Sequence, residues 1–164
     1  MSLITDTNEE FWQAKKVLIT GANGFVGRNL TPLLSKTKAK LYAPSHQDYD
    51  LEEQDQVRAI LSDIKPDVVF HLAGLVGGIL PNSKKPADYC YSNLIMGTMM
   101  MRECQVMGIE KYITLIGSCS YPAELSRAIY EDDLWEGYPQ PESAPYAVAK
   151  KMSVLLAQSF RQQN

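Results

Sequence analysis

A glycine-rich segment directly after a short apolar run constrains the fold of this chain more than any other feature. The run is KVLIT (Lys16–Thr20), and GANGFVG follows it, with glycines at positions 21, 24 and 27. An apolar run that stops at glycine is typical of a buried parallel strand, and the leucines after it recur at helical spacing. In this context the first glycine permits a tight turn, the second lets a pyrophosphate approach the backbone, and the third lets helix and strand pack closely. We therefore predict a dinucleotide contact, rather than a glycine turn without a ligand, at Gly21, Asn23, Gly24, Phe25, Val26 and Gly27.

The rest of the chain alternates strand and helix patterns. Further strands are predicted at 40–43, 67–71 and 111–116, and helices at 53–64, 86–107 and 144–163. This alternation predicts an α/β fold, a doubly wound parallel sheet of the Rossmann type with helices on both faces. We expect residues 1–15 to form an extension with a short helix over 7–14 (Phe11 and Trp12 inward), and 16–164 to form the cofactor-binding domain. The stretch 122–145 has no clear periodicity, and a loop of that length is usually functional or disordered.

Composition narrows the possible partners. The net charge of −3 predicts neither nucleic acid nor an anionic membrane as a partner, and no apolar run has the ~18 residues of a membrane span. The amino-terminal residues lack the apolar segment of a secretory signal. Three cysteines without metal or disulfide spacing predict a reduced, cytoplasmic protein without a bound metal.

The end of the second strand bears on the choice between NAD and NADP. A site that prefers NAD carries an acid there, but this strand ends in APSHQ, residues 43–47. Ser45 is predicted to hydrogen-bond a 2′-phosphate, with His46 adding charge when protonated, which favours NADP; alternatively Ser45 caps a turn. Asp50 and Leu51 are predicted to meet the adenine, although Asp50 is also a candidate N-cap of the next helix.

Small residues follow the third strand in the sequence HLAG. We predict that Leu72, Ala73 and Gly74 lie against the cofactor, as does Leu115 near the end of the following strand. His71 is interpreted as a core or supporting residue rather than a base. The methionines at 99–101 are interpreted as adaptable core packing.

A tyrosine and a lysine stand one helical turn apart in PYAVAK. Tyr146 and Lys150 are at i and i+4 and therefore share a helix face. A nearby ammonium favours the phenolate and is predicted to lower the pKa of the tyrosine. Such a tyrosine exchanges a proton with a carbonyl or carbinol oxygen while hydride moves to or from a nicotinamide.

Taken together, TGANGFVG, HLAG, GSCSYP and YAVAK resemble the extended short-chain dehydrogenase/reductase superfamily. LVGGI (75–79), the Cys119-x-Tyr121-Pro122 run and EDDLWEG…PQPESAPYAVAK are similar to the GDP-L-fucose synthase family. The resemblance implies an NADP-dependent epimerase/reductase of GDP-4-keto-6-deoxymannose that forms a homodimer through its long helices.

Residue roles follow from the same resemblance. It implies that Tyr146 donates a proton to the C4 oxygen and that Lys150 tunes it while holding the nicotinamide ribose. It also implies that Cys119 exchanges a proton at C3 or C5 of the sugar. Val76, Gly77 and Gly78 would border the sugar pocket, with Asn93 supporting that face.

The sequence departs from the family pattern in two ways. The family has a serine or threonine four residues before Tyr121, where this chain has Gly117; Ser118 is our choice for the hydroxyl, through a local bulge, with Ser120 second. The family also continues past the Tyr-Lys helix into a substrate domain, whereas this sequence ends at Asn164, and neither His46 nor His71 matches the histidine that partners the cysteine.

We therefore expect the amino-terminal, cofactor-binding part of such an enzyme, and expect these residues alone to bind NADPH weakly with negligible turnover. Within the enzyme class the alternative is a nucleotide-sugar 4-epimerase or 4,6-dehydratase, neither of which needs the thiol. From another class, the alternative is a non-catalytic dinucleotide-binding module, redox sensor or partner subunit.

Overall fold

The computed structural model describes residues 9–163, which form two compact units. The first contains residues 9–73 together with Met100–Thr114, and we call it the sheet unit. The second contains Gly74–Met99 together with residues 115–163, and we call it the helical unit. A single domain over 16–164 stays a prediction.

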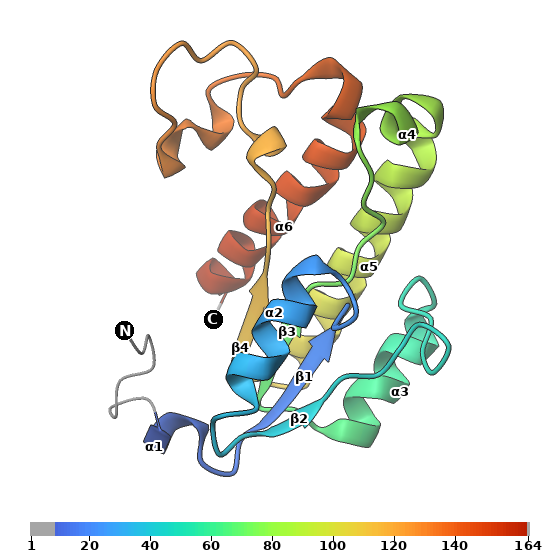
Figure 1. The fold of residues 1–164 in the computed structure, drawn as a ribbon, viewed down its shortest axis with the longest axis vertical. Helices are drawn as coiled ribbons and strands as arrows, with labels where there is room; N and C mark the ends of the chain where they lie inside the picture. Colours follow the sequence, from blue (N-terminus) through green and yellow to red (C-terminus); the bar gives the residue numbers. More distant parts are fainter. Residues whose placement is uncertain (1–8, 164) are drawn as a thin grey trace. The chain divides into compact units, whose positions relative to one another are not determined.

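The sheet unit is built on four parallel strands. These are β1 (Lys16–Thr20), β2 (Lys40–Tyr42), β3 (Val68–His71) and β4 (Lys111–Thr114), in the order β2-β1-β3-β4 (Figure 1). The chain moves outward from β1 to β2 and then crosses back to β3 on the other side of β1. Ligands of open α/β sheets bind at this reversal, beyond the carboxyl ends of the strands.

Successive side chains of each strand point to opposite faces of the sheet, and side chains on both faces are buried. Val17, Ile19 and Val68 form one core cluster with Leu34 of α2 (Phe25–Leu34), and α2 lies across the front of the sheet in Figure 1. Leu18 is also fully buried and, by strand alternation, faces the opposite side. The buried face of α3 (Gln54–Ile64) consists of Val57, Ile60, Leu61 and Ile64. The predicted doubly wound parallel α/β fold is thus confirmed.

The helical unit is formed around two long helices. It contains α4 (Ile79–Lys84), the first part of α5 (Pro86–Val106) and α6 (Ala144–Gln163), with 3₁₀ helices η2 (Ser118–Ser120), η3 (Glu131–Trp135) and η4 (Pro141–Ser143). A Cβ on Gly97 of α5 would lie 3.3 Å from the hydroxyl oxygen of Ser153 on α6. The missing side chain therefore lets these two helices approach closely.

Most predicted elements are present, and the differences have local causes. The fourth strand ends at Thr114, two residues earlier than predicted, and the Ser118–Ser120 segment is a 3₁₀ turn rather than the end of a strand. The backbone N–H of Ser120 donates to the carbonyl of Gly117 at 2.9 Å. Helix α4 was not predicted, and the first helix, α1, spans Glu9–Trp12, with the start of the predicted 7–14 segment outside the described residues.

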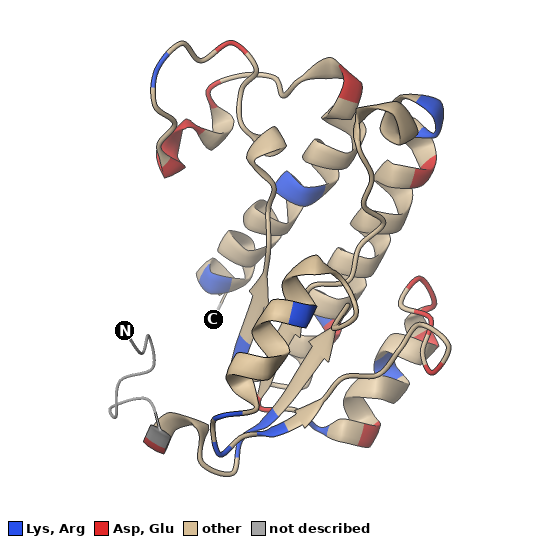
Figure 2. Ribbon diagram, viewed as in Figure 1, with Lys and Arg blue, Asp and Glu red and all other residues tan. Residues whose placement is uncertain are grey.

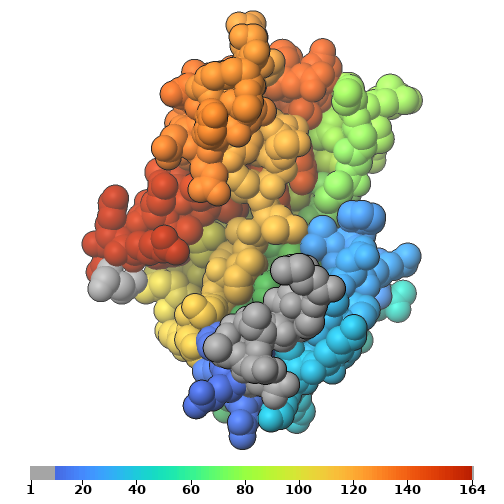
Figure 3. Space-filling model, turned by 60° about the vertical axis from the view of Figure 1, so that its left-hand side comes forward, coloured from blue at the N-terminus to red at the C-terminus, as the bar shows by residue number. Residues whose placement is uncertain are grey.

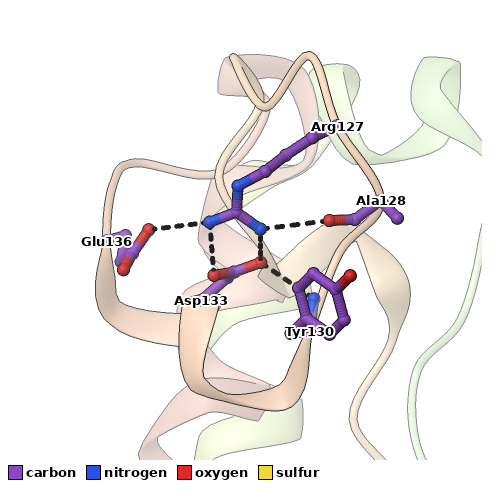
Figure 4. A network of polar contacts seen from close by, with 5 residues as sticks. All are labelled: Arg127, Ala128, Tyr130, Asp133 and Glu136. Carbon is purple, nitrogen blue, oxygen red and sulfur yellow. Dashed lines mark hydrogen bonds and ion pairs between the residues drawn. The ribbon is translucent and has the colours of Figure 1, made fainter.

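The stretch 122–145, predicted to be functional or disordered, contains a local network of ion pairs before α6 begins. Arg127 donates to both carboxylate oxygens of Asp133, at 2.6 and 2.7 Å, and contacts Glu136 at 3.4 Å (Figure 4). These hydrogen bonds, with one from the backbone N–H of Tyr130, hold the pKa of Asp133 below its usual range. Figure 3 shows this segment as a compact group of atoms.

Among residues 9–163, no helix has the length and apolar character needed to cross a membrane. No group of three or more His, Cys, Asp or Glu side chains in the same residues is placed to hold a metal ion.

Candidate functional site

The glycine loop of the sheet unit is set by backbone contacts. Gly21 has φ of +69°, a conformation that side chains disfavour, and a Cβ there would lie 2.6 Å from the backbone nitrogen of Ala73. A Cβ on Gly27 would lie 2.4 Å from the carbonyl oxygen of Gly21. The loop between β1 and α2 therefore closes tightly on itself and against the end of β3.

The start of α2 is open to an anion. Its N-cap is Gly24, which has no side chain to occupy the free backbone N–H groups of the first turn. The side chains of Phe25 and Val26 are exposed. Unpaired N–H groups at the positive end of a helix dipole suit a pyrophosphate, so the predicted loop residues fit a dinucleotide.

A buried polar contact ties β1 to β3 below this loop. The hydroxyl oxygen of Thr20 lies 2.9 Å from Nδ1 of His71 and accepts the backbone N–H of Ala73 at 3.2 Å. Both side chains are almost fully buried, and the imidazole stacks on the ring of Tyr112. His71 thus lies in the core, in the supporting position that the sequence suggested, with Leu72 and Ala73 following it in the sheet unit.

The contacts of the residues after β2 differ from those predicted for a 2′-phosphate site. The backbone N–H and the hydroxyl of Ser45 both donate to the same carboxylate oxygen of Asp48, each at 2.7 Å. Ser45 therefore closes a turn, which was the alternative to a 2′-phosphate contact. His46 is exposed, with Nδ1 4.0 Å from a carboxylate oxygen of Asp50.

Asp50 does not cap α3. The N-cap of α3 is Glu53, and Asp50 accepts the backbone N–H of Glu52 at 3.0 Å, before the helix begins. Its own backbone N–H donates to the side chain of Gln56 at 2.7 Å. Leu51 beside it is buried. The predicted adenine contact of Asp50 and Leu51 stays a prediction.

In the helical unit, two asparagines hold the Leu75–Gly78 loop. The amide nitrogen of Asn93 donates to the carbonyl of Leu75 at 2.9 Å, and that of Asn82 donates to the carbonyls of Gly77 and Gly78 at 3.1 and 3.0 Å. Both asparagines are buried, and their side-chain oxygens have no partner among the described residues. Side-chain amides thus fix the loop that was predicted to border the sugar.

Glycines of this loop also make room for neighbouring side chains. A Cβ on Gly74 would lie 2.8 Å from the side-chain oxygen of Asn93, and one on Gly77 would lie 2.3 Å from the hydroxyl of Tyr89. Val76 projects into solvent, with 71% of its surface exposed. The loop therefore presents an apolar side chain on a rigid backbone.

Gly117, Cys119 and Tyr146 come together in the helical unit. A Cβ on Gly117 would lie 3.1 Å from Sγ of Cys119 and 3.9 Å from Cε1 of Tyr146. A side chain at position 117 would therefore lie close to both the thiol and the phenol ring. This is the position where the family carries its hydroxyl.

Burial controls the acidity of these groups. Burial raises the pKa of the Cys119 thiol. Burial, and secondarily the nearby thiol of Cys119, raises the pKa of Tyr146, while burial lowers the pKa of Lys150. The structure gives Lys150 no hydrogen bond or ion pair with any residue of 9–163, so the predicted lowering of the pKa of Tyr146 by Lys150 is wrong for this arrangement. Desolvation dominates instead.

The two candidate hydroxyls lie in different surroundings. Ser120 is completely buried and donates its hydroxyl to the carbonyl of Ala147 at 3.2 Å, a contact that pins η2 to α6. Ser118 is exposed, and Leu115 nearby in the sequence is also exposed. The strand-bulge argument for Ser118 does not apply, because this segment is a 3₁₀ turn.

Sequence reasoning missed Asp48 and Asn82 as determinants of these sites. Asp48 stands three residues after Ser45, and an S-x-x-D pattern indicates a carboxylate that accepts the serine backbone N–H. Asn82 follows Gly77-Gly78 in α4, a helix that the glycines and Pro81 concealed. The sequence shows that Gly117 stands where the family has a hydroxyl, but its neighbours Cys119 and Tyr146 are visible only in three dimensions.

A hollow of about 320 Å³ adjoins Pro122 in the helical unit. It lies between segments 122–125 and 136–141, and its lining includes Glu124, Glu136 and Tyr138. Two carboxylates disfavour a diphosphate there.

Comparison with known proteins identifies a family that matches most of this chain. Residues 17–164 match the family described as "NAD dependent epimerase/dehydratase family". GDP-L-fucose synthase of Sinorhizobium fredii is 34% identical over 149 residues, which cover 91% of this chain and 48% of the relative. GDP-L-colitose synthase of Yersinia pseudotuberculosis is 33% identical over 152 residues, covering 91% of this chain and 48% of the relative.

A solved structure agrees with the sequence matches. The GDP-L-fucose synthetase of Naegleria fowleri bound to NADP superposes with a TM-score of 0.85 at 27% identity, covering 92% of this chain and 49% of that one. The resemblance stated from the motifs is thus confirmed. The chain spans about half the length of the curated relatives that it matches.

Proposed function

The chain belongs to the NAD dependent epimerase/dehydratase family, and we propose that it is the cofactor-binding part of an NADP-dependent epimerase/reductase of GDP-linked 4-keto sugars. The names of the relatives support a GDP-sugar as substrate, since both GDP-L-fucose and GDP-L-colitose synthases match nearly the whole chain. The solved relative with NADP supports the cofactor.

The observation that carries the proposal is the placement of Cys119 beside Tyr146. A 4-epimerase or a 4,6-dehydratase has no need of a thiol next to its tyrosine, whereas an enzyme that also inverts a carbon next to a carbonyl needs an additional proton-exchanging group. Hydrogens on such a carbon are acidic enough for a thiolate to remove. The contact distances at Gly117 support this assignment, because a Cβ there would approach both the Cys119 thiol and the ring of Tyr146.

Each side chain has a defined task in this proposal. The glycine loop and Lys150 would hold NADPH, which would supply the hydride for reduction at C4. Tyr146, whose pKa is raised by burial, remains protonated at neutral pH and donates its proton to the C4 oxygen. Lys150 binds the nicotinamide ribose through its ammonium, and Cys119 moves a proton at C3 or C5. Ser118 or Ser120 is the remaining candidate for a hydroxyl that contacts the substrate oxygen.

Binding roles follow the two units. The loop residues 21–27 hold the pyrophosphate, and Leu72, Ala73, Gly74 and Leu115 line the cofactor. Val76, Gly77 and Gly78 border the sugar. We also propose a cytoplasmic homodimer formed through α5 and α6, and the free cysteines at positions 90, 104 and 119 are compatible with a reducing compartment.

Deuterium exchange tests the proposal. The protein at its full natural length is incubated with GDP-4-keto-6-deoxymannose in deuterium oxide, with and without NADPH, and the sugar is examined by mass spectrometry. Deuterium should enter at C3 or C5, the Cys119→Ala variant should lose this exchange, and Tyr146→Phe should retain it. Reduction by NADPH without deuterium incorporation would contradict the epimerase part of the proposal.

Gly117 favours a second candidate, a dinucleotide-binding module without turnover, because it removes the hydroxyl beside the phenol. In that case cofactor binding would be measurable, but neither deuterium exchange nor NADPH oxidation would accompany it.

A further inference from the structure

Asp48 captures both hydrogen-bond donors of Ser45. The backbone N–H and the hydroxyl each lie 2.7 Å from one carboxylate oxygen. These hydrogen bonds hold the pKa of Asp48 below its ordinary value, so the side chain is a carboxylate at neutral pH. Ser45 therefore has no free donor for another anion while this turn persists.

The turn lies where a dinucleotide presents its adenosine ribose. β2 and β1 are parallel neighbours, so their carboxyl ends share the edge of the sheet at which the glycine loop begins. With a pyrophosphate at the start of α2, the ribose 2′ position lies over the end of the second strand in this fold. Ser45, three residues beyond β2, is the first polar side chain there.

The connection from β2 to α3 is negatively charged. No lysine or arginine stands between Lys40 and Arg58, and Figure 2 shows acidic residues along the connection from β2 to α3. Arg58 is engaged by Glu103 at 3.1 Å, and His46 faces Asp50. A 2′-phosphate would therefore meet a carboxylate in place of the usual arginine or lysine.

We propose that Asp48 is the residue that limits NADP preference in this chain, because it holds Ser45 and repels a 2′-phosphate. The preference of this chain for NADPH over NADH is then smaller than it would be with a neutral residue at position 48, and neutralising Asp48 increases that preference. This inference rests on the proposed function only in requiring a dinucleotide on the glycine loop.

The experiment uses ligands that contact the adenosine side alone. The chain is titrated calorimetrically with ADP-ribose and with ADP-ribose 2′-phosphate, and the ratio of the two Kd values is compared between variants. For Asp48→Asn we expect the 2′-phosphate ligand to bind about tenfold more tightly while ADP-ribose changes less than about twofold. The gain should shrink as salt rises, because both charges are exposed to solvent.

Asp55→Asn is the matched control. It removes the same charge from the first turn of α3, where Asp55 contacts Arg58 at 3.5 Å and not Ser45. Adding Ser45→Ala to Asp48→Asn should remove part of the gain, because the released hydroxyl is then absent.

The outcomes separate the two proposals. One outcome is that both ligands bind while the ratio of their Kd values is unchanged in Asp48→Asn, or changes equally in Asp55→Asn. Either result would show that the proposed role of Asp48 is wrong, although the dinucleotide site would still be supported. If neither ligand binds any variant, the dinucleotide site itself is wrong, and the role of Asp48 fails with it.

Discussion

Gly21 and Gly117 both follow a strand of the sheet and open a functional loop, yet they are glycines for opposite reasons. Gly21 has φ of +69° and lies against the backbone of Ala73, so no side chain fits there. Gly117 has φ of −87° and ψ of 155°, which any residue adopts, and its Cβ would meet a movable thiol at 3.1 Å. The backbone conformation therefore requires glycine at position 21, whereas it allows other residues at position 117.

The comparison extends to the two units. In the sheet unit, backbone atoms shape the cofactor loop, whereas in the helical unit buried asparagine side chains shape the Leu75–Gly78 loop. A site shaped by backbone atoms can be predicted from the spacing of glycines in the sequence. A site shaped by contacts between distant side chains cannot be predicted in this way.

Substitution of Gly21 should have the largest effect. Gly21→Ala combines a left-handed backbone with a clash against Ala73, and we expect a loss of about 2–4 kcal/mol in the free energy of unfolding. Gly108→Ala is the control, since Gly108 has φ of +67° but nothing within 4 Å of its Cβ, and it should lose only about 1 kcal/mol. Urea unfolding of both variants checks this, and equal losses would show that the close approach is unimportant.

Removal of Asn82 should have the next largest effect. Asn82→Ala deletes the donors to the carbonyls of Gly77 and Gly78, and we expect about 1–3 kcal/mol of destabilisation together with faster amide exchange in the loop. Ser83→Ala, which removes an exposed hydroxyl bound to its own helix, should cost less than about 0.5 kcal/mol. An unchanged exchange rate in Asn82→Ala would show that the loop does not depend on this amide.

The sequence predicted the sheet and the bounds of α6 because their patterns repeat at strand or helix periods, and it predicted the glycine loop because its glycines have a characteristic spacing after a strand. It missed α4, where Pro81 and the two preceding glycines resemble a loop although Gly78 serves as the N-cap. It also placed the cysteine segment at the end of a strand, because only long-range pairing decides where β4 stops. The sequence predicts a lowered pKa for Tyr146, from its helical neighbour Lys150, whereas burial raises it. Burial cannot be deduced from the spacing of two residues.

Restoring a side chain at Gly117 should have a moderate effect on activity. Gly117→Ser places a hydroxyl close to Cys119 and Tyr146, and we expect NADPH oxidation with the keto-sugar to rise about tenfold, since one added donor stabilises the developing oxyanion. Gly117→Ala makes the same close contact without a donor and should give no rise. If both variants lose stability equally and neither gains activity, position 117 does not face the reacting oxygen.

The smallest expected effect is a shift in the pH dependence of Cys119 alkylation. Alkylation requires the thiolate, so a pKa raised by burial means fewer thiolates at any given pH in the folded chain than in the unfolded one. The pH at which iodoacetamide labelling of Cys119 is half-maximal should therefore be higher in the folded chain. Cys104, whose pKa is raised to about 12, should label more slowly still. A midpoint below that of the unfolded chain would mean that a cation stabilises the Cys119 thiolate.

The central claim is that Tyr146 donates the proton that accompanies reduction, and single-turnover oxidation of bound NADPH by the keto-sugar tests it most directly. In the protein at its full natural length, Tyr146→Phe should lower this rate about 10²–10⁴-fold with NADPH affinity unchanged. A Tyr146→Phe variant that oxidised NADPH at the unaltered rate would contradict the assignment.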